Sequence, residues 1–160
     1  MTPARRRPRR VALEPATIDV AVESRVPQRL VSRARARDIV RQALKHAGVR
    51  RAIVSVTFVS GRSIAQLNRT HLGKQGATDV ITFAFSPATT DAPLVADVYI
   101  APEVARDNAR EYNVGAREEI VRLLIHGALH AAGYDHPESD GRMRSAMWRQ
   151  QERLVRAALR

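Results

Sequence analysis

The chain has 160 residues, no cysteine and a formal net charge of +11, and only 4% of its residues are aromatic. This length suffices for one domain with a single core, and the lack of cysteine excludes disulfides, thiolate metal ligands and a cysteine nucleophile. The few aromatic side chains argue against an RNA reader built on base stacking.

The positive charge is concentrated in the first third of the chain. Residues 1–51 hold 14 Lys and Arg against four Asp and Glu, whereas residues 52–160 hold 13 against 12. This asymmetry favours a nucleic-acid partner over a charge that only keeps the chain in solution. Residues 1–15 are rich in Arg and Pro and lack periodicity, so we predict a disordered arm there and a single folded domain over residues 16–160.

Nothing in the sequence suggests a membrane protein. No stretch approaches the roughly 18–20 apolar residues that a spanning helix needs. Glu14 and Pro15 interrupt the segment that would have to form the apolar core of a signal peptide. We therefore expect a cytoplasmic protein with no membrane partner.

The first elements in the chain are a strand and a long helix. Ile18, Val20 and Val22 alternate with polar or small residues, as in a half-buried strand. A helix of about twenty residues follows Pro27 and ends at Gly48. We expect its buried stripe to consist of Leu30, Val31, Ala34, Ile39, Val40, Ala43, Leu44 and Ala47. Beside it runs a row of cations that is either a phosphate-binding surface or an ordinary solvated face: Arg29, Arg33, Arg37, Arg41 and Lys45.

Three more strands follow, with one short helix among them. Residues 53–59 are apolar enough for a central strand, and residues 63–70 form a short helix. A loop with Lys74 between two glycines leads to strands at 78–85 and 94–101. The second of these strands carries Asp97 in an otherwise apolar or aromatic run.

Three helices complete the chain. Pro102 starts a helix that runs to Tyr112, and the helix at 116–132 is apolar enough to lie in the core. Asp140 is the predicted cap of a last helix over residues 141–159, whose inward side chains are Met143, Met147, Leu154, Val155 and Ala158. The order of elements predicts an α+β fold, with a small mixed four-stranded sheet packed against about five helices.

Three of the five histidines lie within eleven residues, at His126, His130 and His136. The first two are four residues apart and project from nearly one face of a helix. Gly133 can take the left-handed conformation that ends a helix, so that the returning chain brings His136 to the same point. Three converging imidazoles with an open fourth position describe a catalytic zinc site on a core helix and the loop after it, and other divalent transition metals, nickel and copper among them, fit the same ligands.

Other polar residues have competing interpretations. Asp135 and Asp97 are candidates for the carboxylate that orients a ligand histidine through its second nitrogen. Asp135 can also act as a base, but we favour an orienting or turn role. Asp79 is a candidate for a hydrogen bond at the start of a strand. The other two histidines, His46 and His71, lack metal-ligand spacing and are predicted to be ordinary surface residues.

The string HGALHAAGYDH at 126–136 is similar to motifs of two families. Its spacing resembles that of the metzincin peptidases, but these carry Glu as general base where this chain has Gly127. The whole string resembles the YbeY family of metal-dependent endoribonucleases. Leu67 and Asn68, then residues 78–83 and 95–100, match further stretches of that family in the same order, so the resemblance covers roughly residues 17–156.

The resemblance implies an endoribonuclease with one zinc ion per chain, held by His126, His130 and His136. Water on the metal, with its pKa lowered from ~15.7 to about 7, would attack the phosphodiester of single-stranded RNA. The implied role is maturation of small-subunit ribosomal RNA and ribosome quality control, with RNA and the ribosome or its proteins as partners.

The sequence departs from the family pattern at two places. His71 and Leu72 stand where the family usually has Tyr-Arg, and Ala96 stands for a Gly. An Arg binds phosphate through two bonds and a Lys through one charge, so Arg69 or Lys74 would replace it imperfectly. The RNA-binding candidates are therefore Arg33, Arg37, Arg41, Arg69 and Lys74. Two alternatives stay open: a non-catalytic ribosome-assembly factor with a structural metal, and a metallopeptidase, which Gly127 disfavours.

Overall fold

The computed structural model describes residues 15–136, 141, 143 and 145–160, and the first fourteen residues of the predicted arm lie outside them. One four-stranded sheet has the order β1-β2-β4-β3. β1 (Thr17–Ser24), β2 (Arg51–Phe58) and β4 (Leu94–Ile100) are parallel, and β3 (Val80–Phe85) runs antiparallel to β4. The predicted mixed sheet, with β2 as an inner strand, is confirmed.

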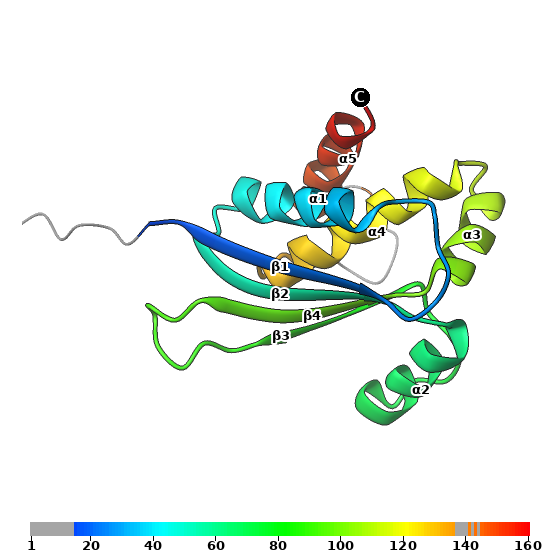
Figure 1. The fold of residues 1–160 in the computed structure, drawn as a ribbon, viewed down its shortest axis with the longest axis horizontal. Coiled ribbons are helices and arrows are strands. Elements are labelled where there is room, and N and C mark those ends of the chain that lie inside the picture. The colour runs from blue at the N-terminus through cyan, green and yellow to red at the C-terminus, as the bar shows by residue number, and fades with distance from the viewer. Residues whose placement is uncertain (1–14, 137–140, 142, 144) are drawn as a thin grey trace, which may run out of the picture.

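Five helices surround this sheet. α1 (Arg33–His46) and α4 (Ala116–Ala131) lie on one face, with α5 (Ala146–Leu159) packed on α4. α3 (Pro102–Glu111) lies at one end of the sheet, and α2 (Gly61–Leu72) lies on the other face (Figure 1). The predicted α+β fold is therefore confirmed. Within the described residues, no helix combines the length and apolarity needed to cross a bilayer.

Strand alternation sorts the side chains onto the two faces of the sheet. On the face toward α1 and α4 lie the buried residues of β1 at 18, 20 and 22 and, in β4, Val98, which has no exposed surface. On the opposite face Ile81, Phe83 and Tyr99 form a smaller cluster with Ile64 and Leu67 of α2. The main core, which carries α4, therefore lies entirely on the first face.

The first and the last helix of the chain, α1 and α5, begin later than the sequence predicts. α1 starts after Ser32, whose side chain accepts a hydrogen bond from Arg35 N, and α5 starts after Ser145, which binds Trp148 N in the same way. A serine hydroxyl satisfies an otherwise unpaired N–H at the first turn, so these caps set the two starts. The predicted cap Asp140 lies outside the described residues.

Two burial predictions for these helices are wrong. Ala34 is exposed, and Ala36 is buried in its place. Met143 precedes α5 and is 69% exposed, whereas Met147, inside the helix, is buried. The sequence period was therefore extended one turn too far at the start of α5, whereas Ala34 lies inside α1 but off its buried stripe.

Arginines of α1 cover the outer edge of the sheet. β1 is an edge strand, and its even-numbered carbonyls point away from β2. Arg37 Nε donates to Val20 O at 3.1 Å, and Arg41 Nε donates to Ile18 O at 3.3 Å. Two members of the predicted cation row thus bind backbone of the same chain.

Candidate metal centre

The three histidines come from the end of α4 and the turn after it. His126 and His130 lie one helical turn apart, and α4 ends at Ala131. Gly133 has φ +94°, a left-handed conformation that turns the chain back toward the helix. One ring nitrogen from each of the three histidines lies within 4.8 Å of the other two, and His130 Nε2 is 3.2 Å from His136 Nε2. The predicted convergence of the three rings is confirmed.

Two of these ring nitrogens have the spacing of ligands in a tetrahedral metal site. At a zinc–nitrogen distance of about 2.05 Å, two ligand nitrogens of a tetrahedral site are about 3.4 Å apart. The 3.2 Å between the His130 and His136 nitrogens is close to that spacing. All three donors are imidazoles, which suit zinc, nickel and copper and leave a coordination position for solvent or substrate.

The ring of His126 is oriented by a residue that the sequence analysis missed. His126 Nδ1 lies 2.8 Å from Gln151 Oε1 of α5, and the two side chains are 9% and 2% exposed. A sequence signal existed, because Gln151 lies four residues after Met147 and three before Leu154, on the apolar stripe of α5. A polar side chain on such a stripe needs a buried partner.

The two carboxylates predicted to orient a histidine have other partners. Asp97 accepts a 2.6 Å hydrogen bond from Ser55 Oγ, and its neighbour Val98 faces α4. Adjacent residues of a strand point to opposite faces, so Asp97 points away from the histidines and the orienting role predicted for it is wrong. Asp135 is exposed, and its Oδ1 accepts from the backbone N of His136 at 2.8 Å, which supports the turn role.

Asp79, His46 and His71 lie outside the cluster. Asp79 accepts hydrogen bonds from Thr78 Oγ1 at 3.3 Å and Asn108 Nδ2 at 2.9 Å just before β3, as expected of a residue at a strand start. His46 is exposed at the end of α1. His71 is exposed on α2 with its ring against that of Phe83.

A group of charges lies one turn before His126. Arg122 donates to Glu118 at 2.8 Å, to Glu119 at 3.0 Å and to Glu152 of α5 at 2.9 Å, and we call these four residues the Arg122 cluster. Burial raises the pKa of Glu119, against the opposing effect of Arg122. Burial alone would raise the pKa of Glu152 too, but hydrogen bonds from Arg122 and Gln151 outweigh it and lower that pKa. The cluster fixes α4 to α5 beside the histidines.

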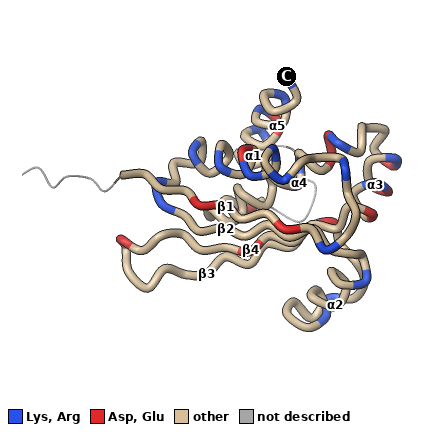
Figure 2. Tube along the Cα trace, in the orientation of Figure 1, with Lys and Arg blue, Asp and Glu red and all other residues tan. Residues whose placement is uncertain are grey.

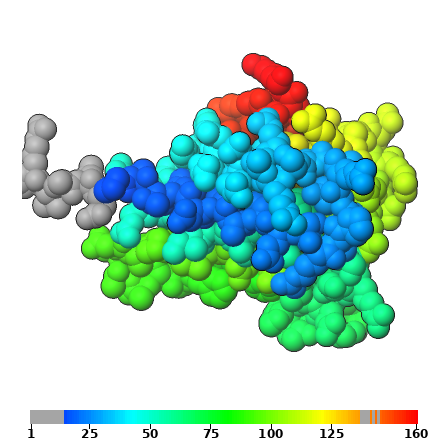
Figure 3. Space-filling view, in the orientation of Figure 1, coloured from blue at the N-terminus to red at the C-terminus, as the bar shows by residue number. Residues whose placement is uncertain are grey.

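The RNA-binding candidates fall on two separate elements. Arg33, Arg37 and Arg41 belong to α1, and Arg37 and Arg41 are engaged at the edge of β1. Arg69 and Lys74 are exposed on α2 and just after it, and Leu72 ends that helix at 46% exposure. Figure 2 shows Lys and Arg on both helices, and in Figure 3 β1 and the segment after it lie between them. The candidates therefore do not form one continuous row.

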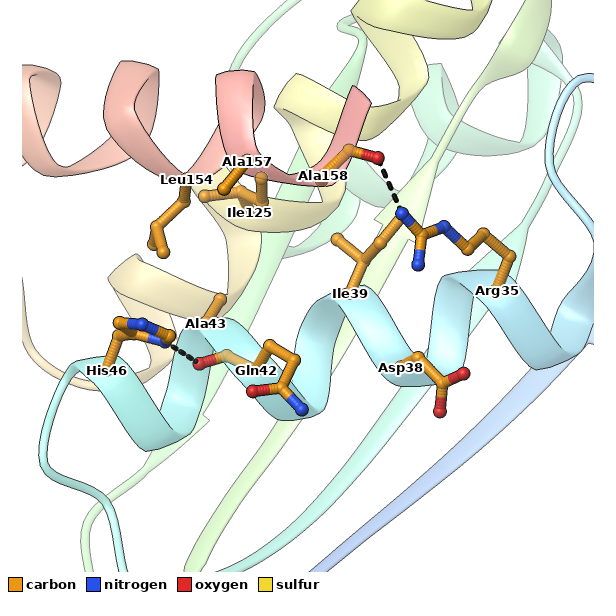
Figure 4. Close-up of a pocket in the computed structure, with 10 residues that line it drawn as sticks. All are labelled: Arg35, Asp38, Ile39, Gln42, Ala43, His46, Ile125, Leu154, Ala157 and Ala158. Carbon is orange, nitrogen blue, oxygen red and sulfur yellow. Dashed lines mark hydrogen bonds between the residues drawn. The ribbon is translucent and has the colours of Figure 1, made fainter. Parts of the chain in front are cut away.

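A cavity of about 260 Å³ between α1 and α5 is separate from the histidine cluster (Figure 4). Its polar rim is formed by Arg35, Gln42 and His46, and its apolar floor includes Ile39, Ile125 and Leu154. Among the described residues, none of the three clustered histidines lines it. It is therefore not part of the candidate metal centre.

The model of the family described as Endoribonuclease YbeY matches residues 21–158, which include the whole histidine cluster. The chain belongs to the YbeY family. The match also includes Gln151 and every member of the Arg122 cluster.

Curated YbeY proteins from several bacteria are similar to this chain. An Endoribonuclease YbeY from Persephonella marina is 32% identical over 123 residues, which are 76% of this chain and 80% of that protein. The one from Chlorobium phaeobacteroides is 30% identical over 80% of this chain and 89% of its own length. A solution structure of a Thermotoga maritima protein matches with a TM-score of 0.60 and 27% identity, covering 87% of this chain and 88% of that one. The family model and the curated relatives thus agree on the family, and the solved structure shares the fold.

Proposed function

We propose that this chain is a zinc-dependent endoribonuclease that cuts single-stranded RNA. The observation that carries the proposal is the convergence of His126, His130 and His136 within 4.8 Å in a chain that matches the YbeY family over residues 21–158. The similar curated proteins are named endoribonucleases. Zinc is the proposed metal because three neutral imidazoles in a tetrahedral arrangement are a common catalytic zinc site.

In this proposal the zinc supplies the chemistry, and the side chains around it hold and orient the site. Bound zinc would supply a Lewis acid and a water whose pKa falls from ~15.7 to about 7, as cleavage of a phosphodiester requires. His126 and His130 would hold the metal from α4, and His136 would close the site from the turn. Gln151 orients His126, and Asp135 holds the backbone at His136.

The packing of α4 weighs against a metallopeptidase. A Cβ at Gly127 would lie 2.7 Å from Val98 Cγ1, so α4 touches the sheet at this position. The peptidase base is a Glu at this position. No side chain longer than hydrogen fits there without moving the helix that carries two of the three histidines.

We infer that the substrate is small-subunit ribosomal RNA, with the ribosome or its proteins as partners. The net charge of +11 supports a polyanionic substrate, and the exposed cations Arg33, Arg69 and Lys74 are proposed phosphate contacts. The affinity for single-stranded RNA should then fall with salt, with a slope of about −0.7 per phosphate contacted. Binding that does not depend on salt would contradict this part.

A second candidate function is a ribosome-assembly factor in which the metal is structural. Leu72 favours it, because this exposed apolar residue stands where the family usually has an Arg. Against this function stands Arg69, one turn earlier on α2, which is the nearest arginine on that helix that can contact phosphate in place of the missing Arg.

The test is cleavage of a labelled single-stranded RNA by zinc-loaded protein. His130→Ala should abolish cleavage, whereas His46→Ala, a matched change outside the cluster, should leave it unchanged. Equal cleavage by wild type and His130→Ala would refute the proposal, since the activity would then come from elsewhere. Zinc binding without cleavage, also in the presence of ribosomes, would favour the assembly factor.

A further inference from the structure

The contact between His126 and Gln151 determines which nitrogen of His126 carries the hydrogen. Nδ1 lies 2.8 Å from the amide oxygen Oε1, and an amide oxygen can only accept a hydrogen bond. The hydrogen is therefore on Nδ1 and the ring lone pair on Nε2. Nε2 is then the nitrogen that can bind a metal, and the other ring nitrogen is held in a buried hydrogen bond.

Glu152 determines which end of the Gln151 amide faces His126. Gln151 Nε2 donates to Glu152 Oε1 at 3.3 Å. A carboxylate that accepts from the amide nitrogen turns the amide oxygen toward the histidine. If the amide were reversed, its oxygen would face the carboxylate and its NH₂ would face Nδ1. The hydrogen of His126 would then have to sit on Nε2, where it blocks metal binding.

The carboxylate of Glu152 is itself held in place from α4. Arg122 donates to it twice, from Nε to Oε1 at 2.9 Å and from Nη2 to Oε2 at 3.3 Å. Such a paired contact fixes the plane of the carboxylate as well as its position. Arg122 lies one turn before His126 on α4. The series of contacts therefore starts on α4, passes through two neighbouring residues of α5 and returns to the histidine on α4.

We propose that Gln151, held by Glu152, is a positioning residue that keeps His126 in the Nδ1–H tautomer and thereby sets the affinity of the three-histidine site for zinc. The inference rests on the metal site of the proposed function, but not on RNA cleavage. Loss of the hydrogen-bond partner of a metal-binding histidine typically weakens metal binding 10–100-fold.

The test compares three variants as full-length protein. Gln151→Met keeps the length of the side chain and removes the acceptor, whereas Gln151→Glu keeps an acceptor. Gln150→Met is the matched control, because its neighbouring amide accepts from Arg153 at 2.8 Å on the outer side of α5. The affinity for Zn²⁺ is measured by competition with a coloured chelator. The tautomer of His126 is read from long-range ¹H–¹⁵N correlation spectra of metal-free protein.

Wild type should show His126 as the Nδ1–H tautomer. Gln151→Met should bind Zn²⁺ about 10–100-fold more weakly and lose the preference for that tautomer. Gln150→Met should keep both the tautomer and the affinity of wild type, and Gln151→Glu, whose side chain still accepts from Nδ1–H, should keep the tautomer.

The outcomes separate this inference from the proposed function. Wild-type affinity in Gln151→Met, or an equal loss in Gln150→Met, would overturn the positioning role alone. A wild-type spectrum with the hydrogen on Nε2 would also overturn it, even if Gln151→Met does not fold. A wild-type protein that binds no Zn²⁺ would overturn both proposals.

Discussion

Gly127 is the point at which α4 touches the sheet, and replacing it with alanine tests that packing directly. A Cβ at this position would lie 2.7 Å from Val98 Cγ1, 3.4 Å from Val98 Cγ2 and 3.3 Å from Thr82 Oγ1. Val98 has no exposed surface and lies in the inner strand β4, so it cannot turn away. Gly127→Ala must therefore push α4 away from β4 or strain Val98.

Two opposing effects set the size of the change. Overpacking a tight core lowers the free energy of unfolding by about 2 kcal/mol, and alanine in place of glycine inside a helix raises it by about 1 kcal/mol. We expect Gly127→Ala to lower the free energy of unfolding by about 1 kcal/mol in the wild-type background. In the background of Val98→Ala the clash with Val98 is absent and only the contact with Thr82 remains, so the same change should raise the free energy of unfolding by up to about 1 kcal/mol. The predicted coupling between the two positions is therefore about 2 kcal/mol.

Urea unfolding followed by circular dichroism measures all four proteins of this cycle. A chelator is present throughout, so that differences in metal affinity do not enter the free energy of unfolding. The reasoning is refuted if Gly127→Ala is as stable as wild type, or if it costs the same in both backgrounds. In either case α4 would not be limited by Val98, and the argument that the peptidase base has no room at Gly127 would fail with it.

Three further predictions concern charge, pH and backbone. Arg122→Met leaves the buried carboxylate of Glu119 and two partly buried ones without their partner, and should lower the free energy of unfolding by about 3–5 kcal/mol. The same change at the exposed Arg110 should cost less than about 0.5 kcal/mol, and equal losses in urea unfolding would contradict this. The pKa of Glu152 is lowered in the folded protein, so its contribution is present above the ordinary value of 4.5 and is lost as pH falls through the lowered pKa. The free energy of unfolding of Glu152→Gln should therefore differ most from that of wild type near neutral pH and least in acid. A difference that grows in acid would contradict this prediction. Gly133→Ala, at φ +94°, should cost roughly 1–2 kcal/mol and weaken zinc binding through His136, and Gly133→Asn, which tolerates this conformation better, should cost less in both assays.

Much of the fold could be predicted from local sequence patterns, which involve only residues close to one another in the chain. The alternation at 18, 20 and 22 predicted β1, and the His126–His130 spacing with Gly133 predicted the convergence of three rings. Each of these follows from the local backbone period and one glycine. The starts of α1 and α5 were wrong because a serine hydroxyl caps the first turn, and the apolar period alone would have begun each helix earlier.

The residues around the histidines could not be found in this way. Asp97 was a candidate for orienting a ligand histidine but lies on the other face of the sheet, because an apolar strand gives no sign of which alternate set faces the helices. Gln151 lies 25 residues after His126, and only the packing of α5 on α4 brings the two together. The roles of Arg37 and Arg41 depend on β1 being an edge strand, which the strand order decides.

The two arginines over β1 have a consequence for how copies of this chain behave at high concentration. An unpaired edge strand offers its carbonyls to a strand of another molecule, which is the first step of strand-by-strand polymerisation. At Ile18 and Val20 those carbonyls already accept from Arg41 and Arg37, so an incoming strand must first displace two guanidinium groups. The bulk and charge of these side chains therefore protect this edge from self-association, a role in solubility that needs no RNA.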